Sequence, residues 1–419
     1  MTSFPLDALR GRFPSLATQD GGRRRIYLDN PAGTQVPKSV ADVIGDAILN
    51  RNANLGGEFA TSRAAGTIVE AAHGAMADFL GCDSDEVVIG ANMTTLTYHF
   101  SRMIGRGLKP GDEIIVTQMD HEGNVSPWLQ LADDLGLVIR KLPFSTATWQ
   151  VEPAALKAAI TDRTKVVALN YASNLTGSIN DASKLVAIAR ARGVLTYVDA
   201  VQFAPHGLVD VRALDCDFLV CSAYKFFGPH LGILYGRRAV LDMLDPYKCR
   251  CSDNGLPQRF ETGTPQIELL AGLTAAVDHF AWLGGACGEG GSRREKIATA
   301  YAHSIAHENA LCGDLVEGLL QVDGLTIHGI SDKARFSARV PTVSFTLSDI
   351  APAELVRALN EEGIFCWAGH NYAWEVVHQL GIDPDKGVVR IGIASYNMGS
   401  EIAETVEAVQ RNVRMLRQG

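Results

Sequence analysis

Short apolar runs alternate with helical patterns through the middle of the chain, and this alternation constrains the fold more than any other feature. The runs that favour strands cover residues 86–89, 113–117, 138–141, 165–171, 195–199, 218–222 and 232–235. Ala- and Leu-rich segments with helical spacing lie between several of them, including 154–160 and 182–192. Strands that alternate with helices are typical of a mostly parallel sheet with helices on both faces. The sequence therefore predicts an α/β fold.

The pattern changes after about residue 265, which predicts a second, smaller domain. A helical stretch runs from 267 to 319 with a glycine-rich interruption at 284–291, and strands are expected near 340–347, 364–367 and 388–393. We therefore expect three parts. These are an N-terminal segment (1–25) that packs with the small domain, a large domain (26–265), and a linking helix with the small C-terminal domain (266–419).

Charge and composition narrow the range of partners. The net charge is −9 and no run of Lys or Arg occurs, so we expect neither nucleic acid nor an acidic membrane surface as a partner. No apolar run approaches the ~18 residues of a membrane span, and the N-terminus lacks an apolar signal core, which predicts a cytoplasmic protein. The eight cysteines lack the spacing of a zinc site, and the pair Cys249 and Cys251 is expected to be two surface residues. A small molecule is the expected partner, and no metal is expected.

Three polar residues end apolar runs, where ligands bind in open α/β sheets. They are Asn174, Asp199 and Lys225. Two phenylalanines follow Lys225, so its amine should be partly desolvated, which favours the neutral form and makes it a nucleophile towards an aldehyde. Asp199 could pair with a protonated pyridine nitrogen.

Four blocks of sequence carry a resemblance to a known family. They are residues 119–124 (MDHEGN), 198–202 (VDAVQ), 222–229 (SAYKFFGP) and 260–265 (FETGTP). With the flanking segments 27–35 (YLDNPAGTQ) and 389–397 (VRIGIASYN), they occur in the order found in class V aminotransferases. The chain resembles this family of fold-type I enzymes that use pyridoxal 5'-phosphate (PLP), and within it the cysteine desulfurase-like proteins.

The resemblance implies a fold and a cofactor site. The expected fold has a large domain with a mostly parallel seven-stranded sheet flanked by helices, and a smaller α/β C-terminal domain. Lys225 resembles the Schiff-base lysine and Asp199 the partner of the pyridine nitrogen, whereas His121 matches the imidazole that stacks on the cofactor ring. The residues that match hydrogen-bond donors to the phenolic oxygen are Asn174 and Gln202.

The phosphate site is expected beside the strand at 86–89, where Thr94 and Thr95 begin a helical stretch whose backbone N–H groups suit a dianion. By resemblance, Ser222 and Tyr224 join them. Thr264 matches a residue that reaches the phosphate from the neighbouring subunit, which implies a homodimer with shared active sites.

The substrate side shows where the chain departs from the desulfurases. Arg390 matches the arginine that holds the substrate carboxylate, and the planar guanidinium suits that contact. The other expected substrate contacts are Asn30, His370 and Tyr372. Tyr372 stands where many desulfurases carry the catalytic cysteine, and a tyrosine cannot carry a persulfide. Cys366 lies close by in sequence, but strand alternation is expected to bury it on the other side.

The shared motifs leave the reaction open. A carbanion next to PLP can expel a β-leaving group, regain its proton on the opposite face, or be protonated on the cofactor, which gives a lyase, an epimerase or an aminotransferase. We take a C–S (β-eliminating) lyase as the leading hypothesis because the resemblance is to sulfur-handling proteins. A non-catalytic protein that keeps PLP only for folding is the alternative of a different class.

Overall fold

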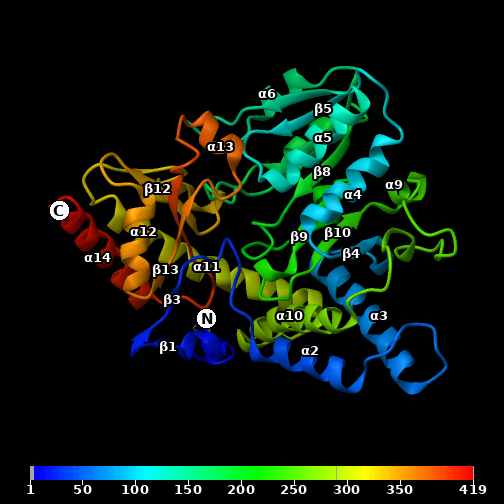
Figure 1. The fold of residues 1–419 in the computed structure, drawn as a ribbon, viewed down its shortest axis with the longest axis horizontal. Coiled ribbons are helices and arrows are strands. Elements are labelled where there is room, and N and C mark those ends of the chain that lie inside the picture. The colour runs from blue at the N-terminus through cyan, green and yellow to red at the C-terminus, as the bar shows by residue number, and fades with distance from the viewer. Residues whose placement is uncertain (1–3, 289, 419) are drawn as a thin grey trace.

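A seven-stranded sheet forms the centre of the computed structural model, which describes residues 4–288 and 290–418 (Figure 1). Its strands are β4 (Val87–Gly90), β5 (Glu113–Thr117), β6 (Val138–Leu142), β7 (Thr164–Asn170), β8 (Leu195–Asp199), β9 (Phe218–Ser222) and β10 (Gly232–Gly236). The order across the sheet is β4-β10-β9-β8-β7-β5-β6. The strands from β9 to β6 are parallel, and β10 is antiparallel to both neighbours. The predicted mostly parallel seven-stranded sheet is confirmed.

Helices cover both faces of this sheet because its strands are apolar on both sides. Along β5, Ile114 and Val116 pack in one core with Trp128, whereas Ile115 packs in a second core with Phe79. The helices of the first face are α4 (Met93–Gly105) and α5 (Ser126–Leu135). Those of the second face include α3 (Ala60–Leu80), α7 (Ala182–Arg190) and α10 (Ile267–Ala286).

A four-stranded antiparallel sheet carries a separate apolar core in the C-terminal part of the chain. Its order is β11 (Leu325–Ile327), β12 (Thr342–Leu347), β15 (Val388–Gly392) and β14 (Trp367–Gly369). Three helices pack around it, namely α11 (Arg293–Leu319), α12 (Pro352–Glu361) and α14 (Gly399–Leu416). Figure 1 shows this part beside the large sheet, joined to it by α10 and α11.

The N-terminal segment packs near this C-terminal sheet. Arg10 forms an ion pair with Glu401 at 2.9 Å, and β3 (Ile26–Tyr27) pairs with β13 (Ile364–Phe365). Ile26 and Leu28 belong to the C-terminal core, so the chain leaves that core only after residue 28. Residues 1–3 of the predicted segment lie outside the described residues.

The predicted helical stretch at 267–319 consists of two helices, as its glycine-rich interruption suggested. Ser292 caps α11 in a capping box with Glu295. Residue 289 of the interruption lies outside the described residues. By length and composition alone, α10 would suffice to cross a membrane, although Glu268 and Asp278 interrupt its apolar sequence, so that the sequence did not predict a spanning run there. Half of its apolar window is buried, including Leu270, Leu273 and Phe280, and the helix contacts α2 (Lys38–Asn50), α3 and α11, as a core helix of a globular protein does.

Candidate active site

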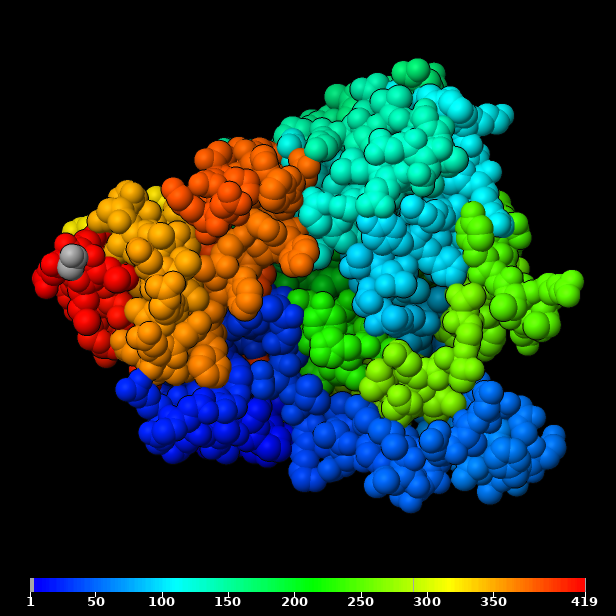
Figure 2. Space-filling model, in the orientation of Figure 1, coloured from blue at the N-terminus to red at the C-terminus, as the bar shows by residue number. Residues whose placement is uncertain are grey.

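A cavity of about 510 Å³ lies where three parts of the chain meet. Figure 2 shows a recess between the C-terminal part (orange) and the part that carries the large sheet (cyan and green), with the N-terminal segment (blue) beside it. Asn170, Asp199 and Ser222 line the cavity and are the last residues of β7, β8 and β9. The cavity therefore lies at the carboxyl edge of the parallel strands, where polar strand ends were expected to meet.

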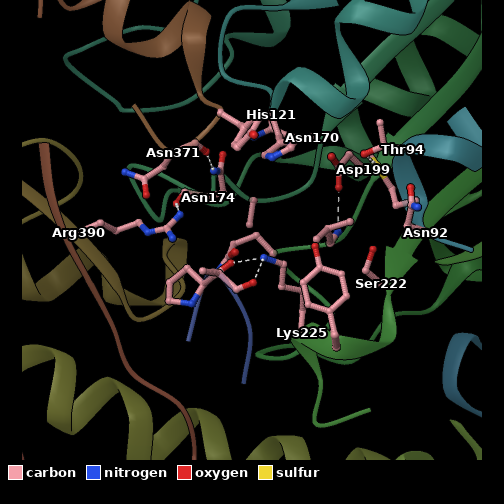
Figure 3. Close-up of a pocket in the computed structure, with 18 of the residues that line it drawn as sticks. Asn92, Thr94, His121, Asn170, Asn174, Asp199, Ser222, Lys225, Asn371 and Arg390 are labelled. Carbon is pink, nitrogen blue, oxygen red and sulfur yellow. Dashed lines mark hydrogen bonds between the residues drawn. The ribbon is translucent and has the colours of Figure 1, made fainter. Parts of the chain in front are cut away.

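One end of the cavity is formed by Asn92, Thr94 and Ser222 (Figure 3). Asn92 caps α4 by accepting a hydrogen bond from the Thr95 N–H at 2.8 Å, so the N-terminus of this 13-residue helix faces the cavity. A Cβ at Gly232 would lie 2.2 Å from the carbonyl carbon of Asn92, so only glycine lets β10 approach this helix start so closely. An exposed helix N-terminus with nearby hydroxyl groups is a suitable cradle for a phosphate.

Lys225 enters the cavity from the turn after β9. Its Nζ donates hydrogen bonds to the carbonyl oxygens of Pro31 and Ala32, the latter at 2.8 Å. Burial first and the positive charge of Arg390 second lower the pKa of the Lys225 amine to about 7, against the opposing effect of Asp29 and Asp199. A large share of the amine is therefore neutral near pH 7, as a nucleophile or base requires.

Asp199 is buried on the same cavity, where its carboxylate accepts a hydrogen bond from the Val201 N–H at 2.8 Å. Burial raises the pKa of Asp199 to about 6, although the Val201 N–H and the charge of Lys225 act in the opposite direction. Asp199 and Lys225 line the same cavity, and the charge of each shifts the pKa of the other.

His121 lies across the cavity from Lys225 (Figure 3). Its Nδ1 accepts a hydrogen bond from the Gly123 N–H at 2.9 Å, which fixes the imidazole. Burial, together with the charges of Lys225 and Arg390, lowers the pKa of His121 to about 3. The ring is therefore neutral at physiological pH and offers a flat face to a ligand.

Arg390 and Asn174 form the end of the cavity opposite Thr94 (Figure 3). Arg390 is buried, lies 3.2 Å from Asp29 and donates to the Asn174 carbonyl oxygen. Asn174 Nδ2 donates to the carbonyl oxygen of Asn371 at 2.7 Å. The buried Arg390 Nε and Asn174 Oδ1 have no hydrogen-bond partner within the described chain. Such groups fit a ligand that supplies both an acceptor and a donor.

Two further predicted cofactor residues line the same cavity. Gln202 is buried and donates to Thr342 Oγ1 at 3.1 Å, and Tyr224 stacks on His230 with ring centroids 4.8 Å apart. The predicted set around Lys225 thus surrounds one space with an amine, a buried carboxylate, a flat imidazole and a helix N-terminus. These residues fit PLP.

Four predicted residues do not line this cavity. Asn30 is buried and donates to the Gly392 carbonyl oxygen at 2.8 Å. The side chain that lines the cavity from this segment is that of its neighbour Asp29. His370 accepts a hydrogen bond from the Tyr372 N–H at 3.0 Å, and its ring meets the Tyr372 ring at 81° without lining the cavity. Thr95 and Thr264 are exposed and line a neighbouring cavity.

Asp29, Asn92, Asn170, Asn371 and the Pro31 and Ala32 carbonyl groups were missed in the sequence, although each lines the cavity or bonds within it. Asp29 could have been found from its place in the extended segment 27–30, where side chains alternate between two sides.

Among the described residues that line the cavity, none is a cysteine. Tyr372, which was expected from the sequence to replace the desulfurase cysteine, lines the cavity. Cys366 is 3% exposed and lines a separate shallow depression, where burial raises its pKa to about 12. The prediction that strand alternation buries this thiol away from the site agrees with that position.

Comparisons with known proteins place the chain among relatives over its whole length. Residues 26–404 match the family model described as Aminotransferase class-V. The chain is 32% identical to a cysteine desulfurase of Yersinia pestis, which covers 99% of this chain and 100% of that protein. It is 31% identical to the aminotransferase-like protein FGM3 of Gibberella zeae, with 98% of each covered.

Solved structures agree with these matches. The structure of a cysteine desulfurase from Thermococcus onnurineus superposes with a TM-score of 0.87 at 26% identity and covers 99% of both chains. The cysteine desulfurase CsdA of Escherichia coli gives a TM-score of 0.84 at 26% identity, over 99% of this chain and 100% of that one.

Proposed function

The chain belongs to the class V aminotransferase family of PLP-dependent enzymes, and we propose that within this family it is a C–S lyase that eliminates the β-substituent of an amino acid without forming a persulfide. One observation supports the proposal: among the described residues that line the cavity none is a cysteine, whereas Tyr372, which the sequence resemblance matches to the desulfurase thiol, is one of them. Cysteine desulfurases as relatives favour a sulfur-containing substrate.

When bound, PLP supplies an electron sink for negative charge at the substrate α-carbon. Lys225 would hold the α-proton, since a pKa of about 7 lets its amine accept and return a proton near neutrality. Asp199 would keep a ring nitrogen protonated from its buried position. The neutral His121 would stack on the ring face, and Arg390 would hold the substrate carboxylate.

The overall reaction is balanced by water alone. The C–S bond breaks with its electron pair on sulfur, the α-proton is removed, and hydrolysis of the remaining enamine gives pyruvate and ammonia beside the free thiol. No oxidant or reductant is required. A desulfurase would instead leave alanine and place sulfur on the enzyme.

The products distinguish the alternatives. We expect the purified enzyme to form equal amounts of pyruvate and thiol from cysteine S-conjugates, and its intact mass should not increase by a sulfur atom. Lys225→Ala is the matched control and should form neither product. Alanine with enzyme-bound sulfur would indicate a desulfurase, and solvent deuterium at the α-carbon without pyruvate an epimerase. Accumulation of the pyridoxamine form would indicate an aminotransferase, and each of these three results would refute the proposal.

A cytoplasmic location is part of the same proposal. Cys249 and Cys251 are exposed free thiols, which persist in reducing compartments. Fractionation of cells that express the tagged protein tests this, and recovery from a secreted or membrane fraction would contradict it.

A further inference from the structure

Two large aromatic side chains stand at the mouth of the cavity. Trp367 is 55% exposed and Tyr372 is 65% exposed, and both line the cavity. Trp367 comes from β14 and Tyr372 from the loop that follows this strand. Exposed aromatic surface at a cavity mouth is costly to leave in water and is typical of a ligand contact.

The Tyr372 loop is held in a strained conformation. Asn371 and Tyr372 have φ values of 53° and 57°, in the left-handed region that a tyrosine rarely adopts. The Glu122 N–H donates to the Tyr372 carbonyl oxygen at 2.8 Å, and Asn174 donates to the Asn371 carbonyl oxygen at 2.7 Å. Both donors belong to the part of the chain that carries the large sheet. Strained backbone conformations that are held by such contacts cluster at active sites and ligand-binding sites.

The ring of Tyr372 extends an aromatic surface outward from the cofactor site. It stacks on His121 with centroids 5.5 Å apart and an interplanar angle of 25°, and it packs edge-to-face with His370, with centroids 5.8 Å apart. Arg390, which would hold the substrate carboxylate, is paired with Asp29, whereas the neighbouring Asn174 and Asn371 bring amide groups to the same cavity. This end therefore offers π faces and amide groups to a substrate.

We infer that the substrate carries a planar aromatic group beyond its sulfur atom, so that it is an S-aryl conjugate of cysteine held between Trp367 and Tyr372. This inference rests on the proposed function for the reaction, but the planar group is recognised by binding alone. Stacking of this kind adds roughly 0.5 to 1.5 kcal/mol beyond burial, which is roughly a two- to tenfold preference for a planar group over a saturated group of similar size.

A binding test separates planarity from size. L-Homophenylalanine has the shape of an S-phenyl conjugate without its leaving group, and the analogue with a cyclohexyl ring has a similar size but is not planar. We expect spectral titration of the PLP-loaded enzyme to give a dissociation constant roughly two to ten times lower for the phenyl compound. Tyr372→Leu and Trp367→Leu should each reduce this ratio, whereas Tyr372→Phe should keep it. Equal affinities in the wild-type enzyme, or a ratio that survives both leucine substitutions, would overturn the inference.

The reaction is measured separately with S-phenyl- and S-cyclohexyl-cysteine. If the phenyl preference appears in binding but no pyruvate forms from either conjugate, the proposed function fails and the recognition of a planar group stands. If pyruvate forms from both conjugates with equal kcat/KM and the ligands bind equally, elimination stands and the inference fails.

Discussion

The reactivity of Lys225 depends on where its amine is placed. The pKa is lowered to about 7 by burial first and by the charge of Arg390 second. A lysine reacts with an aldehyde only in its neutral form, so the rate of PLP capture by the cofactor-free protein should rise with pH to a plateau with a midpoint near 7. Stopped-flow absorbance would measure this rate.

Arg390→Gln removes the positive charge that helps to lower the pKa of Lys225. The midpoint of the pH dependence of PLP capture should therefore move to higher pH, because less positive charge opposes protonation of the Lys225 amine. A wild-type midpoint near 10, the value of an ordinary lysine, would show that the amine is solvated.

Asp199 should matter for chemistry more than for folding. Asp199→Ala removes the buried acid that would keep the ring protonated, so we expect kcat to fall by roughly 10²- to 10⁴-fold while Lys225 still binds PLP covalently. Borohydride reduction followed by mass spectrometry measures that attachment. Asp120→Asn is the control, because Asp120 is also buried but lies outside the cavity, where it accepts from Asn124 at 2.7 Å. A comparable loss of kcat in the control would mean that any buried acid here supports activity.

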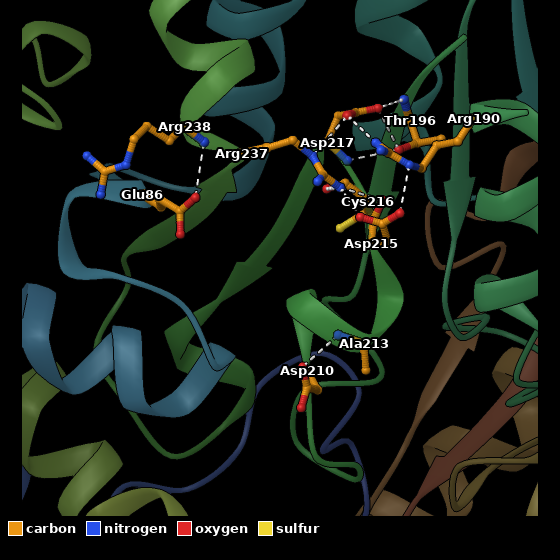
Figure 4. Close-up of polar contacts among 10 residues, drawn as sticks. All are labelled: Glu86, Arg190, Thr196, Asp210, Ala213, Asp215, Cys216, Asp217, Arg237 and Arg238. Carbon is orange, nitrogen blue, oxygen red and sulfur yellow. Dashed lines mark hydrogen bonds and ion pairs between the residues drawn. The ribbon is translucent and has the colours of Figure 1, made fainter. Parts of the chain in front are cut away.

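At the scale of the strands, stability and chemistry lie at opposite ends. Asp217 directly precedes β9. Its carboxylate accepts hydrogen bonds from Arg190 at 3.0 Å and from the N–H and hydroxyl of Thr196, which lies near the start of β8 (Figure 4). Arg237 also contacts it, at 3.3 Å. The cavity lies at the other ends of these strands. The network therefore belongs to the sheet and not to the site.

Asp217→Ala should lower the free energy of unfolding by about 1 to 3 kcal/mol, because it leaves the buried Thr196 N–H and hydroxyl without their acceptor, whereas Arg190 keeps its ion pair with Asp215 at 2.9 Å. Urea unfolding measures this change. The affinity for PLP under native conditions should stay the same, and a large loss of that affinity would show that the two ends of the sheet are coupled.

The large sheet could be predicted because its strands are apolar on both faces. Strands β5, β8 and β9 match the predicted runs residue for residue, and the other four differ by one or two residues at their ends. The predicted strand at 364–367 is instead two strands, since β13 pairs with β3 whereas β14 pairs with β15. The sequence pattern does not show which partner a strand will choose.

The same limit applies to the site. Lys225, Asp199 and His121 belong to local motifs and were found, whereas the pairing of Asp29 with Arg390 joins residues 361 positions apart and was not. Asn30 was chosen over Asp29 because a motif gives positions and not the side of the backbone on which each side chain lies.

At the scale of the whole molecule, Thr264 is a predicted phosphate ligand that lies outside the cavity of its own chain. It is exposed and lines a cavity with Thr95 and Gly90, outside the one that holds Lys225. We propose that the protein is a homodimer in which Thr264 reaches the phosphate site of the partner subunit. Thr264→Ala alone should then weaken PLP binding by roughly tenfold, the value of one hydrogen bond to a charged group.

A mixed dimer tests this arrangement. One subunit carries Lys225→Ala and the other Thr264→Ala, each with a different tag, so that mixed dimers can be purified. If Thr264 acts across the interface, the site that keeps Lys225 also receives an intact Thr264, and half of the sites should bind PLP with wild-type affinity. If Thr264 acts within its own chain, the subunit that keeps Lys225 has lost its own Thr264. Every site that can bind PLP covalently should then show the weakened affinity for PLP. Light scattering that gives the mass of a monomer would refute the shared site, because no partner subunit would then be present to supply Thr264.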